Sequence, residues 1–194
     1  MCSFKAWRQR RLLARHPLAD SAWAAVLAQL PILAGLDAAE EQRLRRRVVL
    51  FLHAKRLTAL PGVSLDDHDR LCLAADLDWY QGFHELLLYP DDFHSPQHHR
   101  DASGVVHEWD AEHSGEAWLQ GPVILAWPGV QQSGQWDGYN LVIHELAHKL
   151  DMLNGDANGL PPLHRDMRQS DWAAVMQSAY EHLNRQLDQH PQRE

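Results

Sequence analysis

Residues 138–153 read GYNLVIHELAHKLDML and give the strongest structural signal in the chain. Apolar residues recur there at mixed spacings of three to five positions, which lets one helix face pack on a core. These residues are Leu141, Leu146, Leu150 and Leu153. Asp137 is the expected N-cap, and Asn154-Gly155 supplies a stop signal of the left-handed type. The stretch therefore predicts a helix with one buried face.

The same helix carries two histidines four residues apart, His144 and His148. At this spacing two side chains lie within roughly 40° of each other, so both imidazoles can bind one Zn²⁺. Glu145 can reach past that metal and take a proton from the water that the metal activates. This order of residues is the HExxH pattern of zinc metalloproteases. We therefore predict His144 and His148 as metal ligands and Glu145 as the general base.

A rival interpretation follows from the high histidine content of the chain. With 14 His in 194 residues, roughly one such sequence in twenty contains HExxH by chance. The two histidines would then be hydrogen-bonded to the core without a metal. The helical context favours the metal site. A second segment that begins His84-Glu85 has no second His, and it is predicted to be a buried strand.

Composition and charge narrow the class of protein. Hydrophobic residues make up 45% and charged residues 23% of the chain, as in ordinary globular proteins. A net charge of −8 argues against direct nucleic-acid or membrane partners. The basic run from Lys5 to Arg15 is the exception, and we expect a flexible, solvated terminus over residues 1–19. No apolar run approaches a membrane span, and two cysteines imply no disulfide framework, so a cytoplasmic setting is expected.

Residues 20–194 are predicted to form a single domain. Its expected parts are N-terminal helices over 20–55, a sheet with the motif helix over 56–155, and a C-terminal loop and helix over 156–194. Capping signals at Asp20-Ser21, Asp37 with Glu40, Ser64 with Asp67, and Ser170 place helices at 22–30, 37–55, 64–77 and 171–189. Short apolar or alternating runs predict strands at 56–60, 85–89, 105–109 and 123–127, and residues 91–100 are predicted to be a His-rich loop.

Several segments resemble the family of Mlc titration factor A. They are DWYQGFHE at residues 78–85, SGEAW at 114–118, QGPVILAW at 120–127 and GYNLVIHELAHKLD at 138–151, continued by Asn154-Gly155-Asp156. This family consists of bacterial cytoplasmic zinc peptidases with a gluzincin-like fold, which is also similar to the catalytic domain of anthrax lethal factor. The resemblance runs from about residue 20 to the end, and the motif helix is its most specific part.

The resemblance implies a fold and a function. The fold is α+β and zincin-like, with a twisted mixed sheet, an active-site helix beneath it, a cleft between them, and N-terminal helices before the sheet. The strand at residues 123–127 would form the cleft edge on which an extended peptide is held through backbone hydrogen bonds. The implied function is zinc-dependent hydrolysis of a peptide or protein, aminopeptidase action included, linked to glucose uptake through the transcriptional repressor Mlc.

The third zinc ligand is the main departure from the family. The resemblance implies a Glu from a helix well after the motif, in an Asn-Pro-x-Glu-Phe-Phe-like segment, and no such segment occurs before Glu194. We therefore expect a C-terminally truncated member. His164, Asp166 and Glu181 are chemically capable ligands, but none matches the family position. The first hypothesis is that the protein is a zinc peptidase. The alternative is that it binds the repressor without catalysis, or that it is an inactive fragment.

Overall fold

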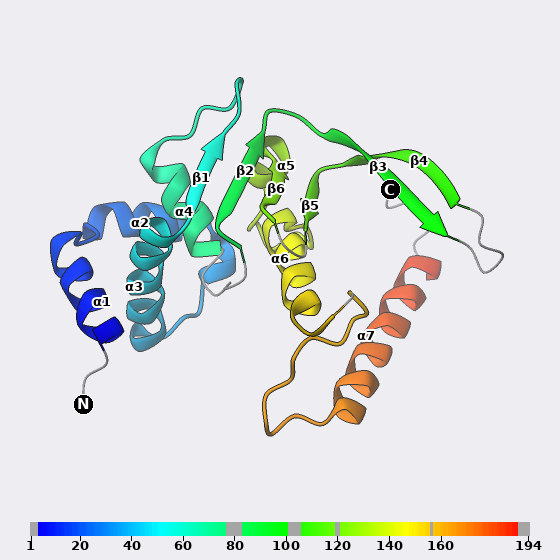
Figure 1. The fold of residues 1–194 in the computed structure, drawn as a ribbon. Coiled ribbons are helices and arrows are strands. Elements are labelled where there is room, and N and C mark those ends of the chain that lie inside the picture. Colours follow the sequence, from blue (N-terminus) through cyan, green and yellow to red (C-terminus); the bar gives the residue numbers. More distant parts are fainter. Residues whose placement is uncertain (1–3, 77–82, 101–105, 119–120, 156, 190–194) are drawn as a thin grey trace. The chain divides into compact units, whose positions relative to one another are not determined.

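The computed structural model describes residues 4–76, 83–100, 106–118, 121–155 and 157–189 (Figure 1). The chain divides into two compact units, Met1–Lys149 and Leu150–Glu194, where the sequence predicts one domain over residues 20–194. Each unit is described by itself. Parts of the family resemblance lie outside the described residues, namely 78–82, Gln120 and Asp156.

The first unit begins with helices α1 (Phe4–Arg15), α2 (Asp20–Gln29), α3 (Ala38–Ala54) and α4 (Asp67–Asp76), with a 3-10 turn η1 (Pro31–Leu33) after α2. Residues 4–15 of the terminus that was predicted to be flexible form helix α1. Its Leu12 borders a groove that Leu50 and Ala54 of α3 also line, so α1 has an apolar side that packs on α3. The many arginines of the segment conceal this side in the sequence.

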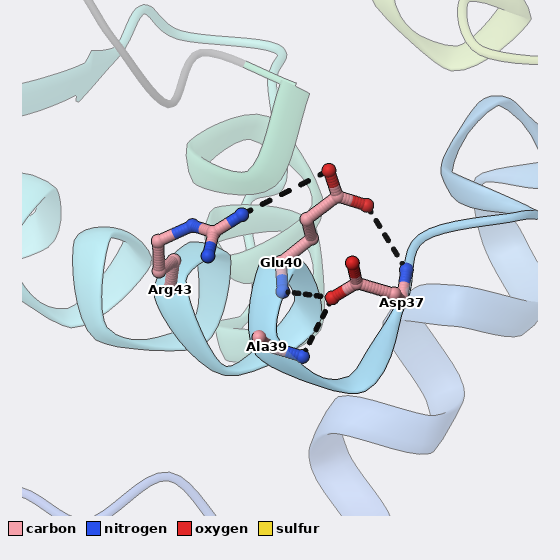
Figure 2. Close-up of polar contacts among 4 residues, drawn as sticks. All are labelled: Asp37, Ala39, Glu40 and Arg43. Atoms are coloured by element: carbon pink, nitrogen blue, oxygen red, sulfur yellow. Dashed lines mark hydrogen bonds and ion pairs between the residues drawn. The ribbon is translucent and has the colours of Figure 1, made fainter.

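Helix α3 starts at the predicted capping box (Figure 2). The Asp37 carboxylate accepts hydrogen bonds from the N–H groups of Ala39 and Glu40, each at 2.8 Å. The Glu40 carboxylate accepts one from the Asp37 N–H at 3.0 Å and lies 3.8 Å from Arg43. These bonds hold the Asp37 pKa below its ordinary value, the bond from Glu40 contributing most. The capping box prediction is confirmed.

The caps predicted for α2 and α4 are wrong. Ala19 occupies the N-cap of α2 and makes no side-chain cap, so Asp20 and Ser21 lie inside the helix. At the start of α4, Asp66 and Asp69 exchange hydrogen bonds between backbone N–H and carboxylate, at 2.8 and 3.0 Å. This pair takes the place that the sequence assigned to Ser64 and Asp67. In both cases several polar residues crowd the helix start, and spacing alone does not select among them.

A four-stranded sheet follows in the described part of the chain, with the order β1-β2-β6-β5. Its strands are β1 (Arg56–Ala59), β2 (Glu85–Tyr89), β6 (Val123–Ala126) and β5 (Gly115–Ala117). The strands β1, β2 and β6 are parallel, and β5 pairs antiparallel with β6. The fold is therefore α+β with a mixed sheet, as predicted.

The position of β6 corrects the predicted cleft edge. All four residues of β6 are buried, and the strand lies between β2 and β5. The edge on this side of the sheet is β5, a strand of three residues that the sequence did not reveal. A continuous apolar run is typical of an interior strand covered on both faces, and this feature of residues 123–126 already favoured an interior position.

The His-rich segment is a strand rather than the predicted loop. Strand β3 (Phe93–Arg100) pairs antiparallel with β4 (Val106–His113), in register from Phe93 opposite His113 to Arg100 opposite Val106. The strand predicted at residues 105–109 therefore forms from 106 onward, but it belongs to this separate two-stranded sheet. Polar strands of this kind depend on cross-strand pairing, which local composition does not encode.

After β6 come α5 (Trp127–Gln132) and the motif helix α6 (Leu141–Asp151). One apolar cluster joins helices α2, α3, α4 and α6 to strands β2 and β6. Its fully buried members include Val26, Val48, Leu86, Leu88, Leu125 and Leu146. On α6 the buried apolar residues are Leu141, Val142 and Leu146, whereas Leu153, predicted to pack on the core, is 54% exposed.

The second unit contains a 3-10 turn η2 (Met152–Asn154) and helix α7 (Gln169–Gln189). The Asp151 carboxylate accepts a hydrogen bond from the Gly159 N–H at 2.7 Å, and the Trp172 indole donates to the Gly159 carbonyl at 2.8 Å. These bonds fold the connecting segment back on itself. Within the described ranges, no helix combines the length and hydropathy that crossing a bilayer would require.

Candidate metal centre

Polar contacts fix the first turn of α6, which precedes the candidate functional residues in the sequence. The Asn140 side-chain oxygen accepts from the Ile143 N–H at 2.8 Å, so Asn140 takes the N-cap position predicted for Asp137. The Asn140 amide nitrogen lies 3.2 and 3.3 Å from the two carboxylate oxygens of Asp76 on α4. Burial raises the pKa of Asp76 to about 6. Asp137 instead accepts from the Tyr139 N–H at 3.0 Å.

The last turn of α5 supplies a second contact with the start of α6. The Ser133 hydroxyl donates to the Gly129 carbonyl at 2.9 Å and accepts from the Leu141 N–H at 3.0 Å. Ser133 is buried, so both bonds are protected from competing water. Contacts with the two neighbouring helices α4 and α5 therefore fix the position of the first turn of α6.

The predicted histidine pair converges in space. The Nε2 atoms of His144 and His148 lie 3.3 Å apart, and the rings are perpendicular at a centroid distance of 4.8 Å. Both side chains are exposed. Two nitrogen ligands of a tetrahedral zinc ion, each about 2.0–2.1 Å from the metal, are about 3.3 Å from each other. The pair thus has the separation that a shared metal ion requires.

Glu145 lies beside the histidine pair but is buried. The ligand atoms of His144, Glu145 and His148 all lie within 4.8 Å of one another, and the described residues contain no other such group of three. Glu145 is only 5% exposed. Its burial, with a smaller contribution from the negative charge of Glu116, raises the Glu145 pKa to about 7. A group with this pKa can both accept and return a proton near neutral pH.

The edge strand passes directly over Glu145. A Cβ atom added to Gly115 would lie 2.5 Å from Cγ of Glu145 and 2.7 Å from its Cδ and Oε1. Only glycine allows the backbone of β5 to approach the carboxylate this closely. A cleft of about 570 Å³ opens beside this contact. Its lining includes Ser114, Gly115, Tyr139, Asn140, His144 and Glu145.

Lys149 is a second buried charged residue of α6, and the sequence analysis did not identify it. Its side chain is 4% exposed. The ammonium group donates to the carbonyl of Trp118, just after β5, and to that of Gly121 at 3.2 Å. Burial lowers its pKa, and the nearby charge of Lys55 adds to this effect. The signal in the sequence was its position, because Lys149 follows the buried Glu145 by four residues and so shares its helix face.

The alternative ligand candidates, His164, Asp166 and Glu181, belong to the second unit. Glu181 is engaged on its own helix, where it accepts from the Gln177 amide at 2.9 Å and lies 4.0 Å from Arg185. Asp151, at the end of α6, uses one carboxylate oxygen to accept from the Gly159 N–H. Within the described residues, the group that could hold a metal is therefore the one in the HExxH motif.

The mixed sheet and the HExxH helix define the class of metallopeptidases, and sequence comparison assigns the family. The chain belongs to the family described as glucose-regulated metallo-peptidase M90, whose model matches residues 4–193. It is 39% identical over 193 residues to Mlc titration factor A of Cronobacter sakazakii. The aligned region covers 94% of this chain and 71% of that protein. The corresponding protein of Salmonella arizonae is 41% identical over 182 residues, covering 88% of this chain and 71% of that protein.

These matches confirm the resemblance found in the sequence. Membership of a metallopeptidase family implies a metal ion, and the chemistry of the site fits one. Two imidazole nitrogens at ligand spacing are open to the solvent, and a carboxylate lies beside them. The chain is therefore a member of a metallopeptidase family with a group suited to hold its metal.

Proposed function

We propose that this protein is a zinc-dependent peptidase that acts in the cytoplasm, with His144 and His148 as zinc ligands and Glu145 as general base. The 3.3 Å separation of the two Nε2 atoms beside a buried carboxylate is the observation that carries the proposal. Imidazole ligands suit zinc, and HExxH places them on one helix face. The open cleft beside Glu145 gives a substrate access to the same point.

The residues of the site divide the reaction between them. Zinc, when bound, polarises the scissile carbonyl and lowers the pKa of a water molecule toward 7. Glu145 accepts the proton of the attacking water and then donates it to the leaving amine. The burial that raises the pKa of Glu145 in the metal-free chain makes its carboxylate a stronger base for accepting that proton. Gly115 keeps the strand above Glu145 free of a side chain that would displace the carboxylate.

We further propose that an extended peptide binds along β5 rather than along β6. The Ser114 carbonyl accepts from the Ala126 N–H at 2.6 Å, which makes this a hydrogen-bonded pair of the antiparallel ladder. The next residues alternate, so the backbone groups of Gly115 and Ala117 face away from β6. An added strand would pair with these groups. The extent of pairing along this edge would determine which peptide lengths are bound. It would also determine whether cleavage occurs at the N-terminus, as in an aminopeptidase.

The enzyme proposal is tested with Glu145→Gln, which keeps the shape of the side chain and removes the proton acceptor. We expect peptide hydrolysis to fall by about 10³-fold, within the range for loss of a general base. Zinc content should match wild type, because the imidazoles are unchanged. The assay contains excess zinc, since two imidazoles alone bind the ion more weakly than a three-ligand site. Equal turnover by the two proteins would refute the assignment of Glu145.

The second candidate function is binding of a transcriptional repressor without need of catalysis. The names of the relatives, Mlc titration factor A, and the glucose-regulated description of the family favour it. We propose that this chain binds a repressor of the Mlc type and thereby affects glucose uptake. Titration of purified Mlc with wild type and Glu145→Gln tests this role. Undiminished binding by the inactive variant supports it, and the absence of binding by both proteins discards it.

A further inference from the structure

One side chain joins the motif helix to the connection that follows the edge strand. Lys149 is the residue after His148, and Trp118 is the residue after β5. The Lys149 ammonium donates to the Trp118 carbonyl and, at 3.2 Å, to the carbonyl of Gly121, the residue two positions before β6. The same side chain therefore contacts both described ends of the β5–β6 connection.

The chemistry of this contact indicates a polar role for Lys149. A buried ammonium group is costly, and lysine is rarely buried without a partner. At 4% exposure, a methionine or leucine of similar length would fill the same space without that cost. What they would lack is the set of donors that satisfies the two carbonyl groups. The lysine therefore supplies hydrogen bonds to the connection rather than packing alone.

The opposite end of β5 is also fixed against α6. The Gly115 backbone lies against the Glu145 side chain, with no room for a Cβ. Gly115 and Trp118 thus flank the strand, and each has a contact with a residue of the motif helix. The height and direction of the edge strand above the helix depend on both contacts. Glycine only permits the approach, whereas Lys149 attracts the far end.

We propose that Lys149 is a positioning residue that fixes edge strand β5 relative to His144 and His148. A peptide paired with the outward backbone groups of Gly115 and Ala117 then meets the metal centre in register. This inference rests on the proposed peptidase function. It also makes a claim about the chain alone, namely that Lys149 restrains residues 114–118 in the absence of substrate and metal.

The chain offers a matched control in Lys55. This residue follows α3, and its ammonium donates to the carbonyl of Phe83, just before β2, while lying 4.3 Å from the Phe83 ring centroid. Burial lowers its pKa as well. Lys55→Met removes a lysine-to-carbonyl bond of the same kind at Phe83, outside β5. Because the positive charge of Lys55 lowers the pKa of Lys149, its removal does not weaken the two hydrogen bonds that Lys149 donates. Any effect common to both variants reflects general stability.

The first experiment is hydrogen–deuterium exchange on metal-free wild type, Lys149→Met and Lys55→Met. We expect the amides of residues 114–118 that face β6 to exchange about tenfold faster in Lys149→Met and as in wild type in Lys55→Met. Lys149→Gln, which keeps a donor on a shorter side chain, should show a smaller increase and serves if Lys149→Met does not fold. Wild-type exchange in the Lys149 variants, or the same increase in Lys55→Met, would overturn the proposal.

The second experiment measures hydrolysis at saturating zinc for a long peptide and for a short aminoacyl amide. In Lys149→Met we expect KM for the long peptide to rise about tenfold, with a much smaller change for the short substrate and unchanged zinc content. An equal effect on both substrates would contradict the positioning role. If wild type hydrolyses neither, the proposed function fails, and the exchange experiment still decides whether Lys149 restrains β5.

Discussion

Helices α3 and α6 both contribute to the core of the first unit, but they bury different kinds of side chain. The buried residues of α3 are apolar, namely Leu44, Val48, Val49 and Phe51. Helix α6 buries Glu145 and Lys149 beside its apolar residues. Charged side chains are destabilising in a core unless they are paired. Packing of apolar side chains therefore explains α3, whereas the two buried charged residues of α6 are those to which we assign roles in the proposed site.

The two helices also begin differently. Helix α3 starts at Asp37 and Glu40, which cap each other within one turn (Figure 2). Helix α6 starts at Asn140, whose amide is held by Asp76 of another helix. The first arrangement is local and forms as soon as the turn forms. The second depends on tertiary contacts, which fix the orientation of a helix whose side chains must meet a metal and a substrate.

After Glu145→Gln, the largest effect on hydrolysis is expected from Gly115→Ala, which tests the functional side of this comparison. The added Cβ would lie 2.5 Å from Cγ of Glu145, so either the strand or the carboxylate must move. A displacement of this kind can reduce the rate by about 100-fold, and we expect such a loss in kcat/KM for peptide hydrolysis. Zinc content should not change, because the three atoms nearest the new methyl group belong to Glu145 and not to a histidine.

Val48→Ala on α3 is the counterpart of this change. Val48 is fully buried, and its truncation should lower the free energy of unfolding by about 2 kcal/mol. Activity per folded molecule should remain that of wild type, since Val48 is a buried residue of α3 and is neither a proposed metal ligand nor a residue that lines the cleft. Chemical unfolding measures the free energy of unfolding. Hydrolysis divided by the number of sites found in a zinc titration measures the activity per folded molecule. Wild-type kcat/KM in Gly115→Ala would remove the role given to the close approach of β5.

The next effect concerns the stability of the metal-free protein as a function of pH. Because the folded pKa of Glu145 is raised to about 7, its contribution is fully present below its ordinary value of 4.5 and is lost as pH rises through 7. Glu145→Gln removes this loss. We expect the variant to exceed wild type in unfolding free energy by about 1–2 kcal/mol at pH 8, a figure reduced for solvent screening beside the open cleft.

The same variant should show little or no advantage at pH 4.5, where the carboxyl group is protonated in the folded state and about half protonated in the unfolded state. Urea unfolding in the presence of a chelator, at pH 4.5, 6 and 8, measures the trend. A variant that is less stable than wild type at pH 8 would mean that the Glu145 carboxylate is well paired rather than desolvated. The result thus distinguishes a desolvated Glu145 carboxylate, which lowers the stability of the folded protein, from a carboxylate in an ordinary buried ion pair.

The sequence predicts the motif helix well because its signals are local. Apolar spacing, the His144–His148 interval and the glycine after the helix all lie within about five helical turns. The capping box of α3 is predicted for the same reason. The histidine pair needed only the helix to bring its nitrogens together, and its role as a pair of metal ligands stays a prediction.

The surroundings of the site could not be predicted in the same way. Strand β5 has three residues, too few for a periodic pattern, and it exists because β6 offers it a partner. The role of Gly115 depends on which helix lies beneath it, and the bond from Lys149 depends on where the β5–β6 connection passes. These are contacts across 28 to 31 positions of sequence, which spacing rules do not reach.

The smallest effect is expected from Asp37→Ala at the start of α3. This change leaves the N–H groups of Ala39 and Glu40 without their acceptor, so the melting temperature should fall by about 2–4 °C at pH 7. Because the folded pKa of Asp37 is lowered, its contribution is present above the ordinary value and is lost as pH falls through the folded value. The difference from wild type should therefore shrink in acid.

Asp37→Asn is the matched control, because its side-chain oxygen still accepts both hydrogen bonds, and it should melt close to wild type at every pH. Peptide hydrolysis per folded molecule should be the same in all three proteins. A loss of activity in Asp37→Ala alone would mean that the start of α3 is coupled to the metal centre. The division between a helix built for packing and a helix that carries function would then fail, since a local cap would control a distant site.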